Sequence, residues 1–151
     1  MYVHIKTLII IITTLLAGYI NVMKDITSTY DSFNILQQHT QLQYLQNLSN
    51  VLNGPNIYIK RDDINALGAG GNKLRKLEFY IADALKNSCD TIITMGAWQS
   101  NHVMLTAVAA AKAGLKYEPI LAKKVPINTD SYNNSGNNFL ENILDLTIHE
   151  T

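Results

Sequence analysis

The chain contains 151 residues, of which 47% are hydrophobic, enough for one core or for part of a larger domain. Twelve basic and twelve acidic residues give a formal net charge of zero, which argues against nucleic acid as the main partner. The single cysteine excludes an intrachain disulfide, and the four scattered histidines have no spacing typical of a metal site.

Residues 1–22 form an apolar N-terminal segment that differs from the rest of the chain, residues 23–151. No charge occurs in residues 8–22, and Lys6 precedes them, a pattern that resembles a signal peptide. The run is short for a membrane span of about 20 residues. Two interpretations stay open: export or membrane anchoring through this segment, or a cytoplasmic protein whose real start is Met23.

The first predicted elements are a helix and a short strand. A stripe of leucines at helical spacing predicts the helix: Leu42, Leu45, Leu48 and Leu52. Asn53-Gly54-Pro55-Asn56 ends this pattern, and residues 57–60 have the composition of a strand.

The next helix is predicted over residues 73–85, after a glycine-rich turn, with Asn72 as its N-cap. Its apolar residues recur at helical spacing: Leu74, Leu77, Ile81 and Leu85. Three cations, Lys73, Arg75 and Lys76, lie in the first turn, where the free N–H groups disfavour each by a few tenths to about 1 kcal/mol. A bound anion, most simply a phosphate, would offset this cost.

The remaining predicted elements alternate. They are a strand at 91–95 that ends at Gly96, a small-residue helix at 100–113 that stops at Gly114, a strand at 117–122 weakened by Pro119, a polar loop at 126–138, a helix at 139–146 and a strand at 147–149. Such alternation predicts an α/β fold with a mostly parallel sheet. The pattern stops partway, so we expect the N-terminal part of a larger enzyme, without its C-terminal half.

Lys73 is the candidate nucleophile. Gly70 and Gly71 permit close approach of a ligand to the backbone, and the helix N-terminus with its neighbouring cations favours a neutral amine at Lys73. A neutral lysine can form a Schiff base with an aldehyde such as pyridoxal phosphate. Lys76 lies on the same helix face, where its ammonium could meet a phosphate oxygen. The alternative for both lysines is a solvated basic face.

A second candidate motif, Gln99-Ser100-Asn101-His102, follows the carboxyl end of a predicted strand, the edge at which open α/β sheets bind ligands. Free N–H groups from Ser100 to His102 could hold a substrate carboxylate, and the Asn101 amide could reach a phenolic oxygen of a cofactor. Taken alone, the motif is better explained by ordinary N-capping of the helix by Ser100 or Asn101.

Several motifs in order resemble the D-cysteine desulfhydrase and 1-aminocyclopropane-1-carboxylate deaminase family over about residues 39–146. They are Ile57-Tyr58-Ile59-Lys60-Arg61-Asp62-Asp63, Gly70-Gly71-Asn72-Lys73-Leu74-Arg75-Lys76-Leu77-Glu78-Phe79, Gln99-Ser100-Asn101-His102 and Ser135-Gly136-Asn137. The resemblance implies a pyridoxal 5′-phosphate enzyme of the tryptophan synthase β-subunit fold, with a three-layer, mostly parallel sheet. It also implies a homodimer at full length, a small amino-acid substrate and no metal.

The resemblance implies a role for each motif residue. Lys73 carries the cofactor and Lys76 helps hold its phosphate. Asn101 bonds the phenolic oxygen, and Gln99, Ser100, Asn101 and His102 line the site of the substrate carboxylate, with Ser100 also counted as catalytic. The implied reaction is that of a lyase or deaminase of the D-cysteine desulfhydrase type, which releases hydrogen sulfide, ammonia and pyruvate; the alternative within the family is the deaminase.

The chain departs from the family pattern in sequence and in length. Gln41 stands where relatives have proline, and Met104-Leu105 replaces a polar pair. The family's phosphate cup, the residue facing the pyridine nitrogen and the substrate-selecting tyrosine belong to the part that is absent. An inactive truncated remnant, or a membrane-anchored binding module that uses residues 8–22, therefore remain alternatives to an active enzyme.

Overall fold

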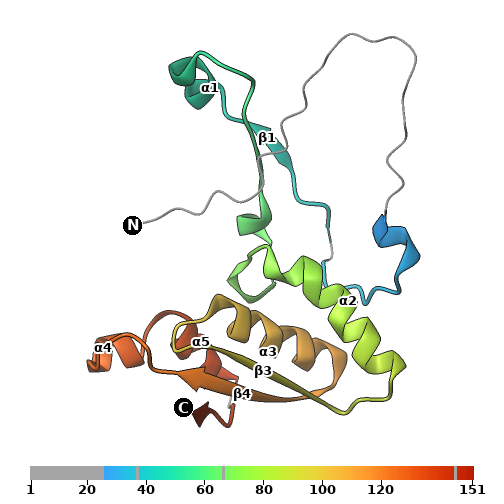
Figure 1. Ribbon diagram of the computed structural model, residues 1–151, viewed down its shortest axis with the longest axis vertical. Coiled ribbons are helices and arrows are strands. Elements are labelled where there is room, and N and C mark those ends of the chain that lie inside the picture. The colour runs from blue at the N-terminus through green and yellow to red at the C-terminus, as the bar shows by residue number, and fades with distance from the viewer. Residues whose placement is uncertain (1–25, 37, 66, 145) are drawn as a thin grey trace.

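The computed structural model describes residues 26–151, apart from residues 37, 66 and 145 (Figure 1). The apolar segment 1–22, with its predicted role in export or anchoring, lies outside the described residues. Within the described part of the chain, no helix has the length and hydropathy that crossing a membrane requires.

A parallel three-stranded sheet forms the base of the fold. Its strands are β3 (Thr91–Ala97), β4 (Lys116–Ala122) and β5 (His149–Glu150), in the order β3-β4-β5. The parallel sheet confirms the predicted topology. β4 continues through Pro119, which had been expected to weaken it. On the β5 side of β4 only Ile120 and Leu121 are paired, so Pro119 lies outside that strand pairing, where a residue without an N–H is tolerated.

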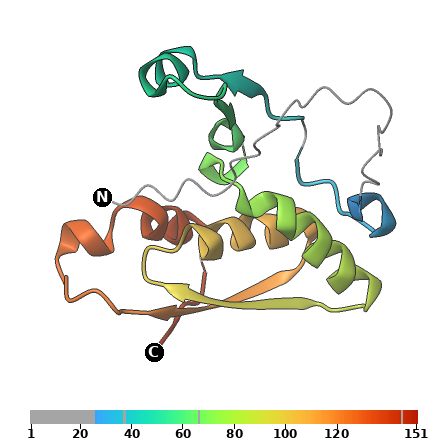
Figure 2. The same cartoon turned by 45° about the horizontal axis from the view of Figure 1, so that its top comes forward.

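Three helices cover one face of this sheet: α2 (Lys73–Lys86), α3 (Asn101–Ala113) and α5 (Gly136–Ile143) (Figure 2). α3 lies between α2 and the strands, and its small residues allow close approach on both sides. Leu74, Leu77 and Ile81 of α2 pack against Met104, Leu105 and Ala109 of α3, and Val103, Ala107 and Ala110 pack against Tyr117 and Leu121 of β4. Each large apolar side chain buried in this way contributes about 1.5–3 kcal/mol.

The opposite face of the sheet bears exposed apolar side chains. Ile93 is 68% exposed and Met95 is 64% exposed, although both lie within β3. Parallel sheets in α/β proteins are normally covered on both faces. The described residues therefore supply two layers of the predicted three-layer architecture, and the third layer is not among them.

A second structural unit stands away from the sheet as an arm (Figure 1). It consists of β1 (Leu42–Tyr44), α1 (Gln46–Leu52) and β2 (Tyr58–Lys60), with β1 and β2 antiparallel. The leucine stripe therefore predicted a helix wrongly at Leu42, since residues 42–44 pair with β2 instead. Leu42 is 63% exposed, so no burial favours a helix at this first position of the stripe.

The polar segment predicted as a loop over residues 126–138 is partly helical. It contains α4 (Asp130–Asn133), whose N-cap Thr129 accepts a hydrogen bond from the Tyr132 N–H, and it includes the first turn of α5. Neither α4 nor the first turn of α5 has the apolar periodicity from which a helix is predicted in a sequence. Short 3₁₀ helices complete the described chain: η1 (Ile26–Thr29), η2 (Asp62–Ile64) and η3 (Leu67–Ala69).

Candidate functional site

The glycine-rich turn before α2 adopts a backbone that requires glycine. Gly70 has φ 77° and Gly71 has φ 130°, both in the region that side chains disfavour. A Cβ on Gly70 would lie 2.4 Å from the carbonyl oxygen of Asp63. The Gly71 N–H donates to the carbonyl oxygen of Asp62 at 2.8 Å, so the turn is packed directly on the backbone of η2.

The same turn touches the beginning of α3. A Cβ on Gly71 would lie 3.1 Å from Asn101 Oδ1 and 3.2 Å from Leu105 Cδ1. The absence of a side chain at Gly71 thus allows the Asn101 amide to lie against the backbone of the turn. The two motifs are therefore neighbours in space, despite their separation in the chain.

Lys73 and Lys76 occupy the first turn of α2 without a carboxylate partner. Lys73 Nζ donates to Asn72 Oδ1 at 2.8 Å, and Lys76 Nζ lies 6.0 Å from the centre of the Tyr80 ring. None of the ion pairs between described residues includes either lysine. Asn72 precedes the helix as predicted, but its side chain makes no cap hydrogen bond, because its oxygen accepts from Lys73.

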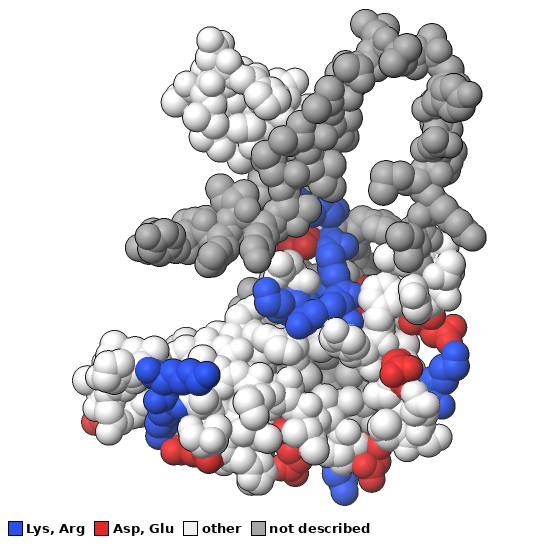
Figure 3. Space-filling view, in the orientation of Figure 1, with Lys and Arg blue, Asp and Glu red and all other residues white. Residues whose placement is uncertain are grey.

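The third cation of the turn, Arg75, is neutralised. Its guanidinium binds Asp62 in a two-point contact, Nε to Oδ2 at 2.8 Å and Nη2 to Oδ1 at 2.6 Å, and Nη2 also donates to Thr40 Oγ1 at 2.6 Å. The hydrogen bond from Arg75 is the main reason why the pKa of Asp62 is lowered. The argument for a bound anion therefore rests on Lys73 and Lys76. Figure 3 shows lysine and arginine side chains gathered on the face near the start of α2.

His102 lies next to these two lysines. Its Nε2 is 3.4 Å from Thr94 Oγ1, and its Nδ1 is 3.4 Å from Thr106 Oγ1. The Thr106 hydroxyl donates to the His102 carbonyl at 2.7 Å, so Thr106 Oγ1 is left to accept a hydrogen bond from the Nδ1–H of His102. Burial, followed by the positive charges of Lys76 and Lys73, lowers the pKa of His102. The lowered pKa favours the neutral form of the His102 ring beside the two lysines.

Ser100 caps α3. Its Oγ accepts a hydrogen bond from the Val103 N–H at 3.3 Å, as the capping interpretation of this motif expects. A Cβ on Gly96 would lie 2.7 Å from this oxygen. The cap leaves the first N–H groups of α3, at Asn101 and His102, without an intrahelical acceptor. A carboxylate at this end of the helix would therefore meet donors and a favourable dipole.

Gln99 is fully engaged with the polypeptide. Its Nε2 donates to the carbonyl oxygens of Tyr132 at 2.7 Å and Ser135 at 3.0 Å, and its Oε1 accepts from the Asn137 N–H at 3.0 Å. Asn137 Nδ2 donates in return to the Gln99 carbonyl at 3.0 Å. The structure thus joins the Gln99 and Ser135-Gly136-Asn137 motifs, a contact that neither motif signals by itself.

These residues fit pyridoxal phosphate chemically. Two lysines without carboxylate partners among the described residues and the nearby N-terminus of α3 together suit an anionic aldehyde. Lys73, Lys76 and Asn101 are the residues that could hold it. Residue-level reasoning missed Thr94 and Thr106, whose positions around the imidazole depend on the packing of β3 against α3.

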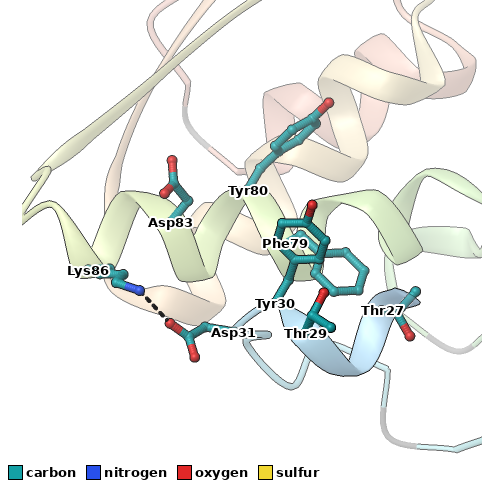
Figure 4. Close-up of a pocket in the computed structure, with 8 residues that line it drawn as sticks. All are labelled: Thr27, Thr29, Tyr30, Asp31, Phe79, Tyr80, Asp83 and Lys86. Atoms are coloured by element: carbon teal, nitrogen blue, oxygen red, sulfur yellow. Dashed lines mark hydrogen bonds and ion pairs between the residues drawn. The ribbon is translucent and has the colours of Figure 1, made fainter. Parts of the chain in front are cut away.

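Two grooves in the described structure lie elsewhere. One, of about 550 Å³, runs between η1 with the two residues that follow it and the second half of α2 (Figure 4). Its lining residues are Thr27, Thr29, Tyr30, Asp31, Phe79, Tyr80, Asp83 and Lys86. The other, of about 130 Å³, lies between η3, α3 and α5. Neither is lined by Lys73, Lys76 or Asn101.

Comparison with known proteins assigns the family. The sequence model for "Pyridoxal-phosphate dependent enzyme" matches residues 34–141. The D-cysteine desulfhydrases of Salmonella paratyphi B and Salmonella newport are each 49% identical over 109 residues, which are 72% of this chain and 33% of the relative. The matched part thus spans about a third of the length of these curated relatives.

A solved structure, described as that of an ACC deaminase homologue, has the same fold. It is 36% identical in sequence, its match covers 83% of this chain and 36% of that chain, and the TM-score is 0.72. This similarity confirms the predicted α/β fold, and the match spans about a third of the solved chain. Pyridoxal 5′-phosphate is the cofactor of the matched family. The chain belongs to the pyridoxal-phosphate dependent enzymes.

Proposed function

We propose that residues 23–151 are the N-terminal part of a pyridoxal-phosphate-dependent lyase or deaminase of the D-cysteine desulfhydrase type. The observation that carries this proposal is the contact between Gly71 and the Asn101 amide, 3.1 Å from an added Cβ to Oδ1. It brings the lysine-bearing turn and the amide-bearing helix start to one place. The curated relatives named D-cysteine desulfhydrase support the choice of reaction.

In this proposal each cation has a separate task. Lys73 would hold the cofactor covalently and would move the proton at the substrate Cα. Lys76, one helical turn further on, binds a phosphate oxygen as a point charge. Asn101 donates to the phenolic oxygen. The cofactor, when bound, supplies an electron sink for the carbanion that loss of the Cα proton creates.

The start of α3 binds the substrate carboxylate. Anions are favoured at the N-terminus of α3, where the N–H groups of Asn101 and His102 and the Ser100 hydroxyl lie. Burial and the two lysines lower the pKa of His102, which favours the neutral form of its ring. A small amino acid is the substrate, and D-cysteine together with a water molecule yields hydrogen sulfide, ammonia and pyruvate.

The complete enzyme needs more polypeptide than this chain provides. The match covers 33% of the D-cysteine desulfhydrases, so about two thirds of their length lies outside it. We propose that those regions complete the phosphate site and that the full-length enzyme is a homodimer.

Cofactor attachment tests the proposal directly. The purified chain is incubated with pyridoxal phosphate and reduced with borohydride, and the label is located by peptide mapping. We expect the label on Lys73 and its loss in Lys73→Arg. Lys86→Arg is the matched control, since Lys86 pairs with Asp31 at 2.8 Å and should not react. A label on Lys60 or Lys86 in place of Lys73 would contradict the assignment.

The similarity to an ACC deaminase homologue supports a second candidate, deamination of 1-aminocyclopropane-1-carboxylate. The two activities share the cofactor and the carboxylate site, and they differ in the bond that breaks. The full-length protein should release sulfide from D-cysteine under the first proposal. Release of ammonia from the cyclopropane substrate, without sulfide from D-cysteine, would favour the second.

A further inference from the structure

We infer that a strap of chain, residues 33–36 together with Thr40, positions the first turn of α2 for the cofactor, and that Glu78 is the positioning residue that holds this strap. The inference deepens the proposed function, because it rests on the assignment of Lys73 as the residue that carries the cofactor. Glu78 lies in the middle of α2, five residues after Lys73, and has no part in the site described above.

The Glu78 carboxylate binds two successive N–H groups of the strap. Its Oε1 accepts from the Ile35 N–H at 3.0 Å and from the Leu36 N–H at 2.9 Å. The backbone carbonyl of Glu78 accepts a third hydrogen bond, from the Phe33 N–H at 2.9 Å. Charge-assisted hydrogen bonds are about twice as strong as neutral ones. One residue of α2 therefore anchors the backbone of the strap.

The strap also joins α2 to α3. Ile35 is fully buried in the core cluster that contains Leu77 of α2 and Met104 of α3. Its carbonyl oxygen accepts a hydrogen bond from Lys112 Nζ, in the last turn of α3, at 3.1 Å. One segment thus holds together the two helices whose first turns meet in the candidate site.

The other end of the strap lies at the first turn of α2. Thr40 Oγ1 donates to Asp62 Oδ1 at 2.6 Å and accepts from Arg75 Nη2 at 2.6 Å. Thr40 therefore belongs to the cluster in which Arg75 and Asp62 bind each other. Arg75 and Glu78 are three residues apart, so they share one face of α2, and the strap is bound at both places on that face.

The cluster acts on the glycine turn through η2. The carbonyl oxygen of Asp62 accepts from the Gly71 N–H at 2.8 Å, and a Cβ on Gly70 would lie 2.4 Å from the carbonyl oxygen of Asp63. A movement of Asp62 therefore moves the turn, and Lys73 follows Gly71 by two residues. Release of the strap at either end would shift this turn without removing any group that touches the cofactor.

The first test measures hydrogen–deuterium exchange of single amides by NMR in the 151-residue chain without cofactor. Glu78→Met removes the carboxylate and keeps a side chain of similar length. We expect the Ile35 and Leu36 amides to exchange about tenfold faster, since they lose their acceptor. The Gly71 amide should exchange about threefold faster, although its own acceptor, the Asp62 carbonyl, is intact. An unchanged rate at Gly71 would overturn the positioning role.

Two further variants serve as controls. Glu78→Gln keeps an oxygen that can accept both hydrogen bonds but loses the charge, so its exchange rates should lie between those of wild type and Glu78→Met. Asp83→Asn makes the same carboxylate-to-amide change at an exposed position of α2 and should leave Gly71 at the wild-type rate. If Glu78→Met does not fold, the comparison of Glu78→Gln with Asp83→Asn decides in its place.

The second test measures cofactor attachment and adds Thr40→Val, which keeps the shape of threonine without the hydroxyl that joins Arg75 and Asp62. The temperature is one at which denaturant titration shows every variant to be folded. We expect Thr40→Val and Glu78→Met each to raise the pyridoxal phosphate concentration for half-maximal labelling of Lys73 by about five- to tenfold. Glu78→Gln should recover part of this loss. Variants that are less stable but are labelled at the wild-type concentration would show a purely structural role and overturn the proposal.

The two tests separate this inference from the proposed function. A wild-type chain that is not labelled at Lys73 contradicts the proposed function, while the exchange rate of Gly71 still decides the strap. Labelling of Thr40→Val and Glu78→Met at the wild-type cofactor concentration contradicts the strap and leaves Lys73 as the attachment residue.

Discussion

The Asn101 amide lies against the backbone of Gly71, with 3.1 Å between Asn101 Oδ1 and the position of an added Cβ, so a side chain at residue 71 would crowd this amide. The pair joins two motifs that carry different tasks, cofactor attachment on one side and carboxylate binding on the other. Changes at either residue should therefore affect both.

Gly71→Ala tests this contact. The substitution combines a φ of 130° with a close approach to Asn101 and Leu105, so we expect a loss of about 2–4 kcal/mol in unfolding free energy and slower labelling of Lys73. Denaturant titration measures the first and peptide mapping the second. Gly114→Ala is the matched control, because Gly114 has φ 72° but no atom near an added Cβ. Equal effects at both positions would show that backbone strain alone is responsible.

The Arg75–Asp62 pair should hold the glycine turn in place. We expect Asp62→Asn to lower the unfolding free energy by about 1–2 kcal/mol at neutral pH, since Asp62 is 17% exposed and accepts from both Arg75 and Thr40. Arg75→Lys should not keep the wild-type unfolding free energy either, because lysine cannot make the two-point contact with Asp62. Asp63→Asn, at an exposed pair with Arg61, should change stability little.

The same pair predicts an acid dependence. The pKa of Asp62 is lowered from 3.8 in the folded chain, so the unfolded chain takes up this proton first. The stability that Asp62 contributes is complete above about pH 4 and is lost as pH falls through the folded pKa. The acid limb of wild-type stability should therefore be steeper than that of Asp62→Asn. Identical limbs would show that the pair adds nothing.

Glu141 predicts the opposite trend. It is 0% exposed, neither carboxylate oxygen has a hydrogen-bond partner within the described residues, and burial raises its pKa to about 7. The folded chain therefore binds this proton more tightly than the unfolded one, and stability should fall as pH rises from about 4.5 to 7 and stay low above it.

Glu141→Gln should remove that slope. At pH 8 the variant should be more stable than wild type by up to about 3 kcal/mol, since 2.5 pKa units separate the raised and ordinary values (7 minus 4.5), whereas at pH 4 the two should be similar. Denaturant titration at both values measures the difference. A wild-type excess of stability at pH 8 would mean that the carboxylate is paired in solution.

The chain alone should turn over D-cysteine far more slowly than a full-length relative. It supplies Lys73 and the start of α3, while its match covers only 33% of the curated desulfhydrases. Sulfide release from the purified chain, measured beside a full-length relative under the same conditions, checks this. Comparable turnover would show that the described residues contain the whole phosphate site.

Sequence periodicity was sufficient for the elements that bury a regular face. α2 runs over Lys73–Lys86 and α3 ends before Gly114, whose φ of 72° is the left-handed value expected at that position. Burial of one face gives these helices a repeat that can be recognised. The stripe from Leu42 has a helical repeat without burial, so pairing with β2 determined the conformation of its first residues.

The candidate site was predictable in its motifs and not in its contacts. The order of the glycine turn, Lys73 and Asn101 is visible in the sequence, whereas Asp62 and Arg75 or Gln99 and Asn137 meet only after the chain has folded. Amide hydrogen bonds between distant loops have no spacing rule. Arg75 was consequently counted with the anion-binding cations, although Asp62 neutralises it.

The bare face of the sheet has a consequence for solubility. Ile93 and Met95 place two large apolar side chains in water in the middle of β3, and a contiguous exposed apolar surface of this kind promotes association. The apparent mass of the isolated chain in light scattering should therefore rise with protein concentration. Replacing Ile93 and Met95 by lysine should keep it monodisperse without disturbing α2, α3 or α5, which lie on the other side.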